Sequence, residues 1–149
     1  MPGFIADPAH LPDGPGAYLI LFDLTTPAAL PPRFGNRHLD PGIYVYAGNA
    51  HGPGGIQARA GRHLRADGAR RWHIDWLTGV AARRLALPLE TIGECEAIHT
   101  LARGGAFTAP ISGFGSSDCS TCAAHLLHWQ GKGVRRALGQ AIEQVLFGP

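Results

Sequence analysis

Residues Gly16-Ala17-Tyr18 and Tyr46-Ala47-Gly48 each lie in an apolar run of the sequence, and an arginine-rich segment follows the second run at once. The first run, residues 17–24, reads AYLILFDL, and the second, residues 42–48, reads GIYVYAG. Short runs of aromatic and aliphatic residues bounded by glycine and proline are typical of buried strands. We therefore predict two strands that bring two phenols beside a cationic helix, an arrangement suited to holding and cutting a phosphodiester.

The arginine-rich segment is predicted to form a helix with two distinct faces. Ile56, Ala60 and Leu64 recur at helical spacing and form a buried stripe. Arg59 and His63 are also four residues apart and share a neighbouring face. The helix is thus expected to bury one side and to offer a cation and an imidazole on another.

The other regular elements follow from the same patterns. Residues 25–41 contain too many prolines and glycines for a long element, so we expect a loop there, with room for a short edge strand at residues 33–39. Apolar periodicity, interrupted by glycine and proline, predicts the remaining elements. In chain order they are the arginine-rich helix at residues 56–65, a second helix at 72–80, a third strand at 82–89, a third helix at 94–103 and a closing helix at 134–147.

The length of 149 residues and a hydrophobic content of 45% suit one globular domain, and the sequence shows no internal repeat and no linker. No stretch approaches the roughly 20 apolar residues of a membrane span, and the start of the chain lacks a charged and then apolar leader. We therefore expect a cytoplasmic protein without a membrane partner. The three cysteines are odd in number, so a disulfide framework is not expected. The sequence leaves the oligomeric state open.

The net charge is only +2, but the basic residues are unevenly distributed. One stretch, in which Asp67 is the only acid, contains Arg59, Arg62, Arg65, Arg70 and Arg71. These side chains either contact the phosphates of a nucleic acid or form a solvated helix face in a chain whose only lysine is Lys132. Both interpretations remain open from the charges alone.

The predicted order of strand, strand, arginine helix, strand and glutamate helix resembles the GIY-YIG endonuclease superfamily, and within it the small stand-alone Uri-type branch. The two glycine-tyrosine segments match the two half-motifs, and the blocks RWHIDWL, ECE and GFGSSDC look like the small branch. The resemblance covers about residues 16–125. It implies a single α+β domain over residues 1–149, with a small central three-stranded, mainly antiparallel sheet flanked by helices and an extra C-terminal helix at residues 130–149.

A literal Gly42-Ile43-Tyr44 also occurs, but geometry argues against it as the first half-motif. The two half-motifs must come from neighbouring strands for their tyrosines to meet across the sheet, whereas Tyr44 and Tyr46 lie on one strand. Tyr18, on the earlier strand, satisfies this requirement.

The resemblance implies a metal-dependent endonuclease that acts on DNA. In the family, a glutamate holds one divalent metal at the scissile phosphate, and a tyrosine of the first half-motif helps to deprotonate water. By position, Tyr18 would be the base and Glu96 or Glu94 the ligand of Mg²⁺ or Mn²⁺. We favour Glu96 over Glu94, because the two are separated by one residue and cannot easily face the same point.

The resemblance also implies roles for the other site residues. A phenol with a pKa near ~10 is a poor base, so Tyr18 needs a cation nearby, and Arg59 could provide it together with a grip on phosphate oxygens. Tyr46 would orient water or phosphate, and His63 would carry a proton or protonate the leaving oxygen. The remaining candidates for contact with DNA are Arg62, Arg65, Arg70 and Arg71.

The sequence departs from the family pattern at three positions. Ala17 and Ala47 replace isoleucines, which alters packing more than chemistry. Asn49 follows the second half-motif, where many active members have lysine. A non-catalytic nucleic-acid-binding module with the same fold is therefore the alternative function.

A separate cluster, Cys119, Cys122 and His125, has a spacing that a zinc ion could use. Its fourth ligand would be Cys95, His99 or His128. The alternative, a structural turn with buried thiols, is favoured from the sequence because a second paired cluster is lacking.

Overall fold

A five-stranded antiparallel sheet organises the computed structural model, which describes residues 3–65, 72–89, 91–103, 106–114, 124–131 and 142. The sheet has the order β5-β1-β4-β7-β6, and each neighbouring pair is antiparallel. The strands are β1 (Gly16–Leu24), β4 (Gly42–Ala50), β5 (Arg83–Leu89), β6 (Phe107–Thr108) and β7 (Leu126–Trp129).

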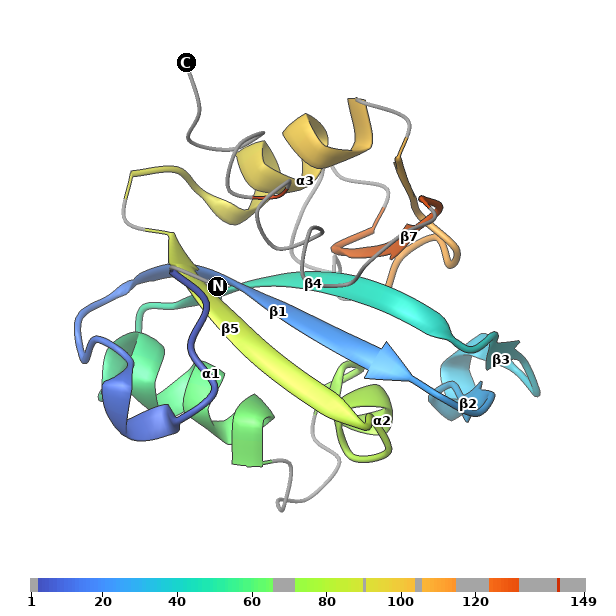
Figure 1. The fold of residues 1–149 in the computed structure, drawn as a ribbon, viewed down its shortest axis with the longest axis horizontal. Helices are drawn as coiled ribbons and strands as arrows, with labels where there is room; N and C mark the ends of the chain where they lie inside the picture. The colour runs from blue at the N-terminus through green and yellow to red at the C-terminus, as the bar shows by residue number, and fades with distance from the viewer. Residues whose placement is uncertain are drawn as a thin grey trace.

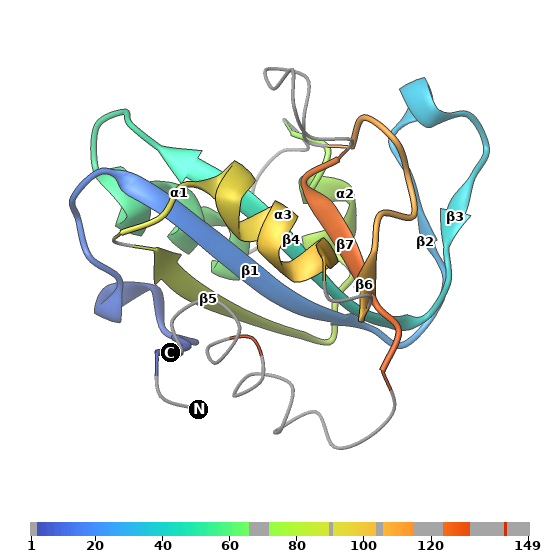
Figure 2. The ribbon, with the colours of Figure 1, turned by 90° about the horizontal axis from the view of Figure 1, so that it is seen from above.

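In the described part of the chain, three helices cover the two faces of this sheet (Figure 1). Helices α1 (Gly55–Arg65) and α2 (Asp75–Thr78) lie on one face, and α3 (Glu94–Arg103) lies on the other, as Figure 2 shows from above. A separate two-stranded sheet, β2 (Ala28–Ala29) and β3 (His38–Leu39), lies beyond one end of the main sheet. Two 3-10 turns complete the described elements, η1 (Pro8–His10) and η2 (Pro32–Phe34).

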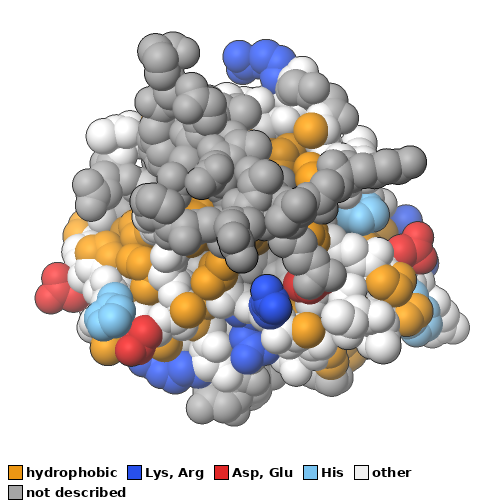
Figure 3. Space-filling model, viewed as in Figure 1, with side chains coloured by type: hydrophobic (Ala, Val, Ile, Leu, Met, Phe, Trp, Pro, Cys, Tyr) orange, Lys and Arg blue, Asp and Glu red, His pale blue; other side chains and the backbone are white. Residues whose placement is uncertain are grey.

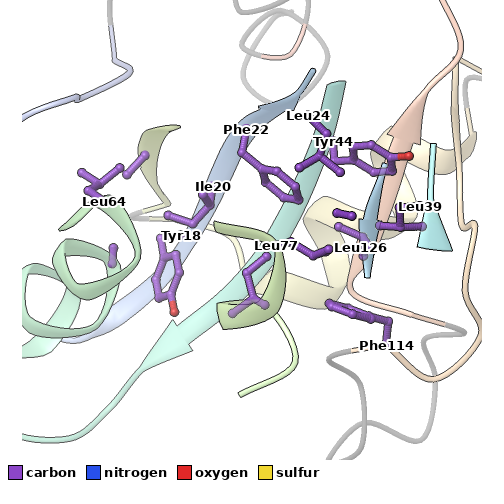
Figure 4. Close-up of a cluster of buried hydrophobic side chains, with 14 of the residues drawn as sticks. Tyr18, Ile20, Phe22, Leu24, Leu39, Tyr44, Leu64, Leu77, Phe114 and Leu126 are labelled. Carbon is purple, nitrogen blue, oxygen red and sulfur yellow. The ribbon is translucent and has the colours of Figure 1, made fainter. Parts of the chain in front are cut away.

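Strand β1 is buried on both faces, which explains why its sequence is almost continuously apolar. Its alternating side chains contribute to two separate hydrophobic clusters. Tyr18, Ile20 and Phe22 belong to the cluster under α1 and α2, part of which Figure 4 shows. Leu19 and Leu21 belong to the cluster under α3. Strand β1 therefore joins both halves of the core.

The predicted central elements are confirmed. Strands β1, β4 and β5 occur at the predicted places and lie side by side, and α1 buries the predicted stripe of Ile56, Ala60 and Leu64. The expected loop at residues 25–41 contains the small β2-β3 sheet, so the short edge strand predicted at residues 33–39 is found in reduced form.

Other expectations require correction. The sheet has five strands rather than three, because β7 adds to the free edge of β4 and β6 adds to β7. The second helix is only the four residues of α2, since residues 72–74 form turns. The predicted closing helix lies outside the described residues except for Ile142, which is buried in the cluster under α3. None of the described helices is long and apolar enough to cross a membrane.

Candidate functional site

The register of β1 and β4 brings the two tyrosines of the half-motifs together. Tyr18 lies opposite Gly48, and Tyr46 lies opposite Ile20, so the two phenols are diagonal neighbours on one face of the sheet. A Cβ atom at Gly48 would lie 2.6 Å from the Tyr18 hydroxyl oxygen. Glycine at this position is therefore required for the Tyr18 ring to cross β4.

Tyr18 is hydrogen-bonded to His63 of α1. The Tyr18 hydroxyl oxygen lies 3.0 Å from His63 Nε2, and each residue is only 1% exposed. Burial raises the pKa of Tyr18 well above its ordinary value and lowers the pKa of His63 to about 4. At neutral pH the pair thus consists of an un-ionised phenol and a neutral imidazole. The expectation that His63 lies on an offered helix face is wrong, because the phenol of Tyr18 and the ring of Trp72 cover it.

Asp75, at the start of α2, lies behind the imidazole. Its Oδ1 is 3.8 Å from His63 Nδ1 and 3.0 Å from Arg62 Nη1, and its Oδ2 accepts the backbone N–H of Trp72 at 2.8 Å. The carboxylate favours a proton on Nδ1, which leaves Nε2 to accept the Tyr18 hydroxyl proton. His63 Nδ1 has no hydrogen-bond partner among the described residues, so the hydrogen-bonded pair ends at His63 and Asp75 acts on the imidazole through its charge.

Arg59 and Arg62 both lie against the indole of Trp72. Their guanidinium carbons are 4.7 Å and 4.5 Å from a ring centroid of Trp72, within the range of cation–π contact. Arg59 also donates from Nη1 to the backbone oxygen of Asn49 at 2.9 Å. Its charge lowers the pKa of both Tyr18 and Tyr46, but burial outweighs it and both pKa values remain raised.

Glu94 is the acidic residue of α3 that reaches this site. One of its carboxylate oxygens accepts a hydrogen bond from the side-chain amide of Asn49, and its charge raises the pKa of both phenols. Glu96, two residues further along, is exposed. The structure therefore places Glu94 beside the tyrosines, although the sequence favoured Glu96.

Tyr44 lies on the same strand as Tyr46 but has a different environment. Its hydroxyl donates to the backbone oxygen of Asp40 at 2.7 Å, and its ring stacks on His128 with centroids 4.4 Å apart. Burial raises the pKa of Tyr44 to about 12. These contacts set Tyr44 apart from the pair formed by Tyr18 and Tyr46.

The basic stretch is only partly described. Arg65 is exposed, Arg62 is paired with Asp75, and Arg70 and Arg71 lie outside the described residues. On the face drawn in Figure 3, the described arginine side chains, in blue, lie in several separate places among hydrophobic side chains.

A second group of polar side chains lies beside Glu94. Cys95 Sγ is 3.5 Å from Nε2 of His125, and the other ring nitrogen of His125 is 4.0 Å from a Glu94 oxygen. Cys119 and Cys122, which the sequence placed with His125, lie outside the described residues. Within the described ranges, no three His, Cys, Asp or Glu residues are grouped so as to hold a metal ion.

Sequence reasoning missed the roles of two residues in this site. Asp75 is not among the site residues expected from the sequence, and Asn49 is noted there only as standing where many family members have lysine. The spacing of Trp72 and Asp75 could have indicated a carboxylate that accepts a backbone N–H three residues earlier, as the N3 acid of a capping box does. No local pattern could have linked Asn49 to Glu94, which lies 45 residues away.

Comparison with known proteins gives one result. A family model described as "Domain of unknown function DUF123" matches residues 17–147. No curated protein and no solved structure matches the chain.

Proposed function

This chain belongs to the DUF123 family, and we propose that it is a metal-dependent endonuclease that hydrolyses phosphodiester bonds in DNA. The observation that carries this proposal is the convergence of two phenols, an imidazole, a guanidinium and a carboxylate from four elements. The resemblance of the two glycine-tyrosine segments to the GIY-YIG half-motifs supports the same activity. The residues concerned are Tyr18, Tyr46, His63, Arg59 and Glu94.

Tyr18 and His63 would move the proton of the attacking water. A free phenolate is not available at neutral pH, because burial raises the pKa of Tyr18. Transfer of the Tyr18 proton to His63 Nε2, as the phenol oxygen accepts a proton from water, avoids that charged state. Asp75 would stabilise the imidazolium that results, since its carboxylate lies 3.8 Å from Nδ1.

Arg59 and Tyr46 would hold the phosphate. The Arg59 guanidinium is already oriented by the Trp72 ring and by the Asn49 backbone oxygen, so its remaining N–H groups are available to phosphate oxygens. Tyr46 is half-buried and therefore lies closer to solvent than Tyr18. It would donate its hydroxyl proton to a phosphate oxygen or to the attacking water.

The carboxylate of Glu94 fits a hard divalent cation. Its side chain is 20% exposed, and a hydrogen bond from the Asn49 amide positions it. Its negative charge raises the pKa of the nearby phenols. Mg²⁺ usually keeps several waters and needs only one or two carboxylates. A Mg²⁺ or Mn²⁺ ion at Glu94 would act as a Lewis acid for the phosphate oxygens.

A second candidate function is a module that binds nucleic acid but does not cleave it. Two observations favour it: Tyr18 is 1% exposed, and the Asn49 amide occupies one oxygen of Glu94. This candidate predicts DNA binding that weakens with salt but no cleavage.

The decisive experiment measures cleavage of labelled branched, duplex and single-stranded DNA by the purified protein with Mg²⁺, Mn²⁺ or chelator. We expect metal-dependent cleavage that falls by about 100-fold or more in Tyr18→Phe and in Glu94→Gln. The matched control is Glu96→Gln, an exposed glutamate on the same helix turn, which should keep wild-type rates.

Cleavage that survives both substitutions would refute the proposed site. Salt-sensitive DNA binding without any cleavage would select the binding module instead. Loss of cleavage in Glu96→Gln, with Glu94→Gln active, would reverse the assignment of the two glutamates.

A further inference from the structure

The segment that connects β1 to β4 takes no part in the proposed nuclease chemistry. Its residues 28–39, which we call the basic arm, contain the β2-β3 sheet and the 3-10 turn η2. The arm lies beyond one end of the main sheet, and α2 lies between it and α1 and contacts both (Figure 1, Figure 2). The arm is thus beside the candidate site but separate from it.

The inner side of the arm is anchored in the core. Three of its apolar residues are at most 3% exposed and belong to the cluster under α1 and α2: Ala28, Leu30 and Leu39. Phe34 stacks on the buried ring of Phe114, with ring centroids 5.6 Å apart. The backbone N–H of Leu30 donates to the oxygen of Arg37 at 3.2 Å, which ties the two sides of the arm together. The arm is therefore held in a defined place.

The outer side of the arm is positively charged. Arg33, Arg37 and His38 are exposed, and the sequence has no acidic residue from position 24 to position 39. Among the described residues, neither arginine is paired with a carboxylate. Arg33 lies instead over the ring of Phe34, with its guanidinium carbon 5.3 Å from the centroid. Uncompensated arginines on one surface are the electrostatic feature that a phosphate backbone recognises.

Two consecutive residues connect the arm to the candidate site. The indole of Trp72 contacts the guanidinium groups of both arginines that α1 contributes to the site. The next residue, His73, lies edge-on to Phe34, with ring centroids 4.9 Å apart. Burial and the charge of Arg33 both lower the pKa of His73. The arginines of α1 and the arm thus flank the same short segment.

We propose that the basic arm is a second contact surface for the DNA backbone, where Arg33 and Arg37 bind phosphates other than the one held by Arg59. This inference rests on the proposed function, because it takes DNA as the partner. The planar guanidinium of arginine can donate two parallel hydrogen bonds to phosphate oxygens. Contacts to phosphates fix the position of a strand without reading its sequence. The arm would therefore add affinity and set the register of the DNA at the tyrosines.

The test measures binding of labelled duplex and branched DNA by fluorescence anisotropy at several salt concentrations, with chelator present to prevent metal-dependent cleavage. Arg33→Gln and Arg37→Gln should each weaken binding by about threefold or more. Each should also reduce the slope of log affinity against log salt by about 0.9, as expected for the loss of one phosphate contact. Both side chains are exposed, so the variants should unfold in urea as the wild type does.

The matched control is Arg103→Gln, at an exposed arginine of α3 on the other face of the sheet. It removes the same single charge and should keep the affinity and the salt slope close to those of the wild type. In the cleavage assay, the two arm variants should raise KM for DNA more than they lower kcat, whereas Glu94→Gln should lower kcat.

Two results would overturn the proposal. If Arg33→Gln and Arg37→Gln keep the affinity and the salt slope of the wild type, the arm does not contact DNA. If Arg103→Gln weakens binding as much as they do, the effect comes from net charge and not from the arm. The anisotropy measurement needs no turnover, so the arm can fail in a protein that cleaves DNA, and cleavage can fail in a protein whose arm binds it.

Discussion

The lack of a side chain at Gly48 leaves room for the Tyr18 ring in the candidate site. The Tyr18 ring passes over this residue, and a Cβ atom would meet its hydroxyl oxygen at 2.6 Å and its Cζ at 2.7 Å. The glycine at position 48 is therefore explained by Tyr18 on the neighbouring strand. The two residues form one steric unit that spans two strands.

We predict that Gly48→Ala displaces the Tyr18 ring and breaks its hydrogen bond with His63. Overpacking at a buried position costs about 1–3 kcal/mol, which urea unfolding would measure. The control is Gly52→Ala, because a Cβ there would have no neighbour within 4 Å. Equal stabilities of the two variants would show that the ring does not cross Gly48.

The buried imidazole of His63 predicts a specific loss of stability in acid. Its pKa falls from 6.5 to about 4 on burial, so between these values the unfolded chain binds a proton that the folded chain does not. Stability is therefore complete above pH 6.5 and decreases as the pH falls toward 4, by about 3 kcal/mol from this residue.

Urea unfolding at several pH values tests this expectation with His63→Gln, which cannot gain a proton. The decrease between pH 6.5 and 4 should be smaller in this variant, whereas His51→Gln, at an exposed position, should follow the wild type. An unchanged pH dependence in His63→Gln would mean that His63 is protonated without cost in the folded state.

Sequence patterns identified most residues of the site but not their partners. Helical spacing placed Arg59 and His63 on one face correctly, yet the burial of His63 depends on Tyr18, which is 45 residues away. The choice between Glu94 and Glu96 likewise depends on Asn49, at the end of another strand. Such contacts depend on tertiary packing, which periodicity does not report.

At the level of elements, strongly patterned segments were predicted well and short ones were not. Long apolar runs predicted β1 and β4, and a clear apolar stripe at helical spacing predicted α1. In contrast, β6 has two residues and β7 has four, too few for a repeating pattern to be visible. β7 is defined by its pairing with the edge of β4, and β6 by its pairing with β7, rather than by their own composition.

Helix α2 has only four residues, so its stability must come from packing rather than from helix propensity. Leu77 is 0% exposed and inserts into the cluster under α1 and α2 (Figure 4). We predict that Leu77→Ala lowers the free energy of unfolding by about 2–5 kcal/mol in denaturant titrations.

The control for this prediction is Val80→Ala, two residues beyond the helix, where the side chain is 52% exposed. It should change stability by less than about 0.5 kcal/mol. A small effect of Leu77→Ala would indicate that α2 is not anchored to the sheet.

At the scale of the whole molecule, the sheet separates two hydrophobic clusters, and a group of polar side chains lies beside each of them. The catalytic candidates of β1, β4 and α1 lie on one face, and Cys95 and His125 lie on the side of α3. Glu94 interacts electrostatically with both groups. The carboxylate of Glu94 is thus shared by polar groups on both sides of the sheet.

The small net charge of +2 also limits how this protein can attract DNA. Long-range steering requires a strong field from many charges, which this chain lacks. Affinity must therefore come from short-range contacts with individual phosphates, and a weak dependence on salt is expected if only a few arginines take part.

The stacking of Arg59 and Arg62 on Trp72 affects how much side-chain entropy is lost when these arginines bind a phosphate. A free arginine side chain loses up to about 2 kcal/mol of rotamer freedom when it is fixed by a ligand. Here folding has already restricted both guanidinium groups against one indole, so an incoming anion would meet side chains with little freedom left to lose. Trp72, which itself carries no charge, would in this way raise the affinity of its two neighbours for phosphate.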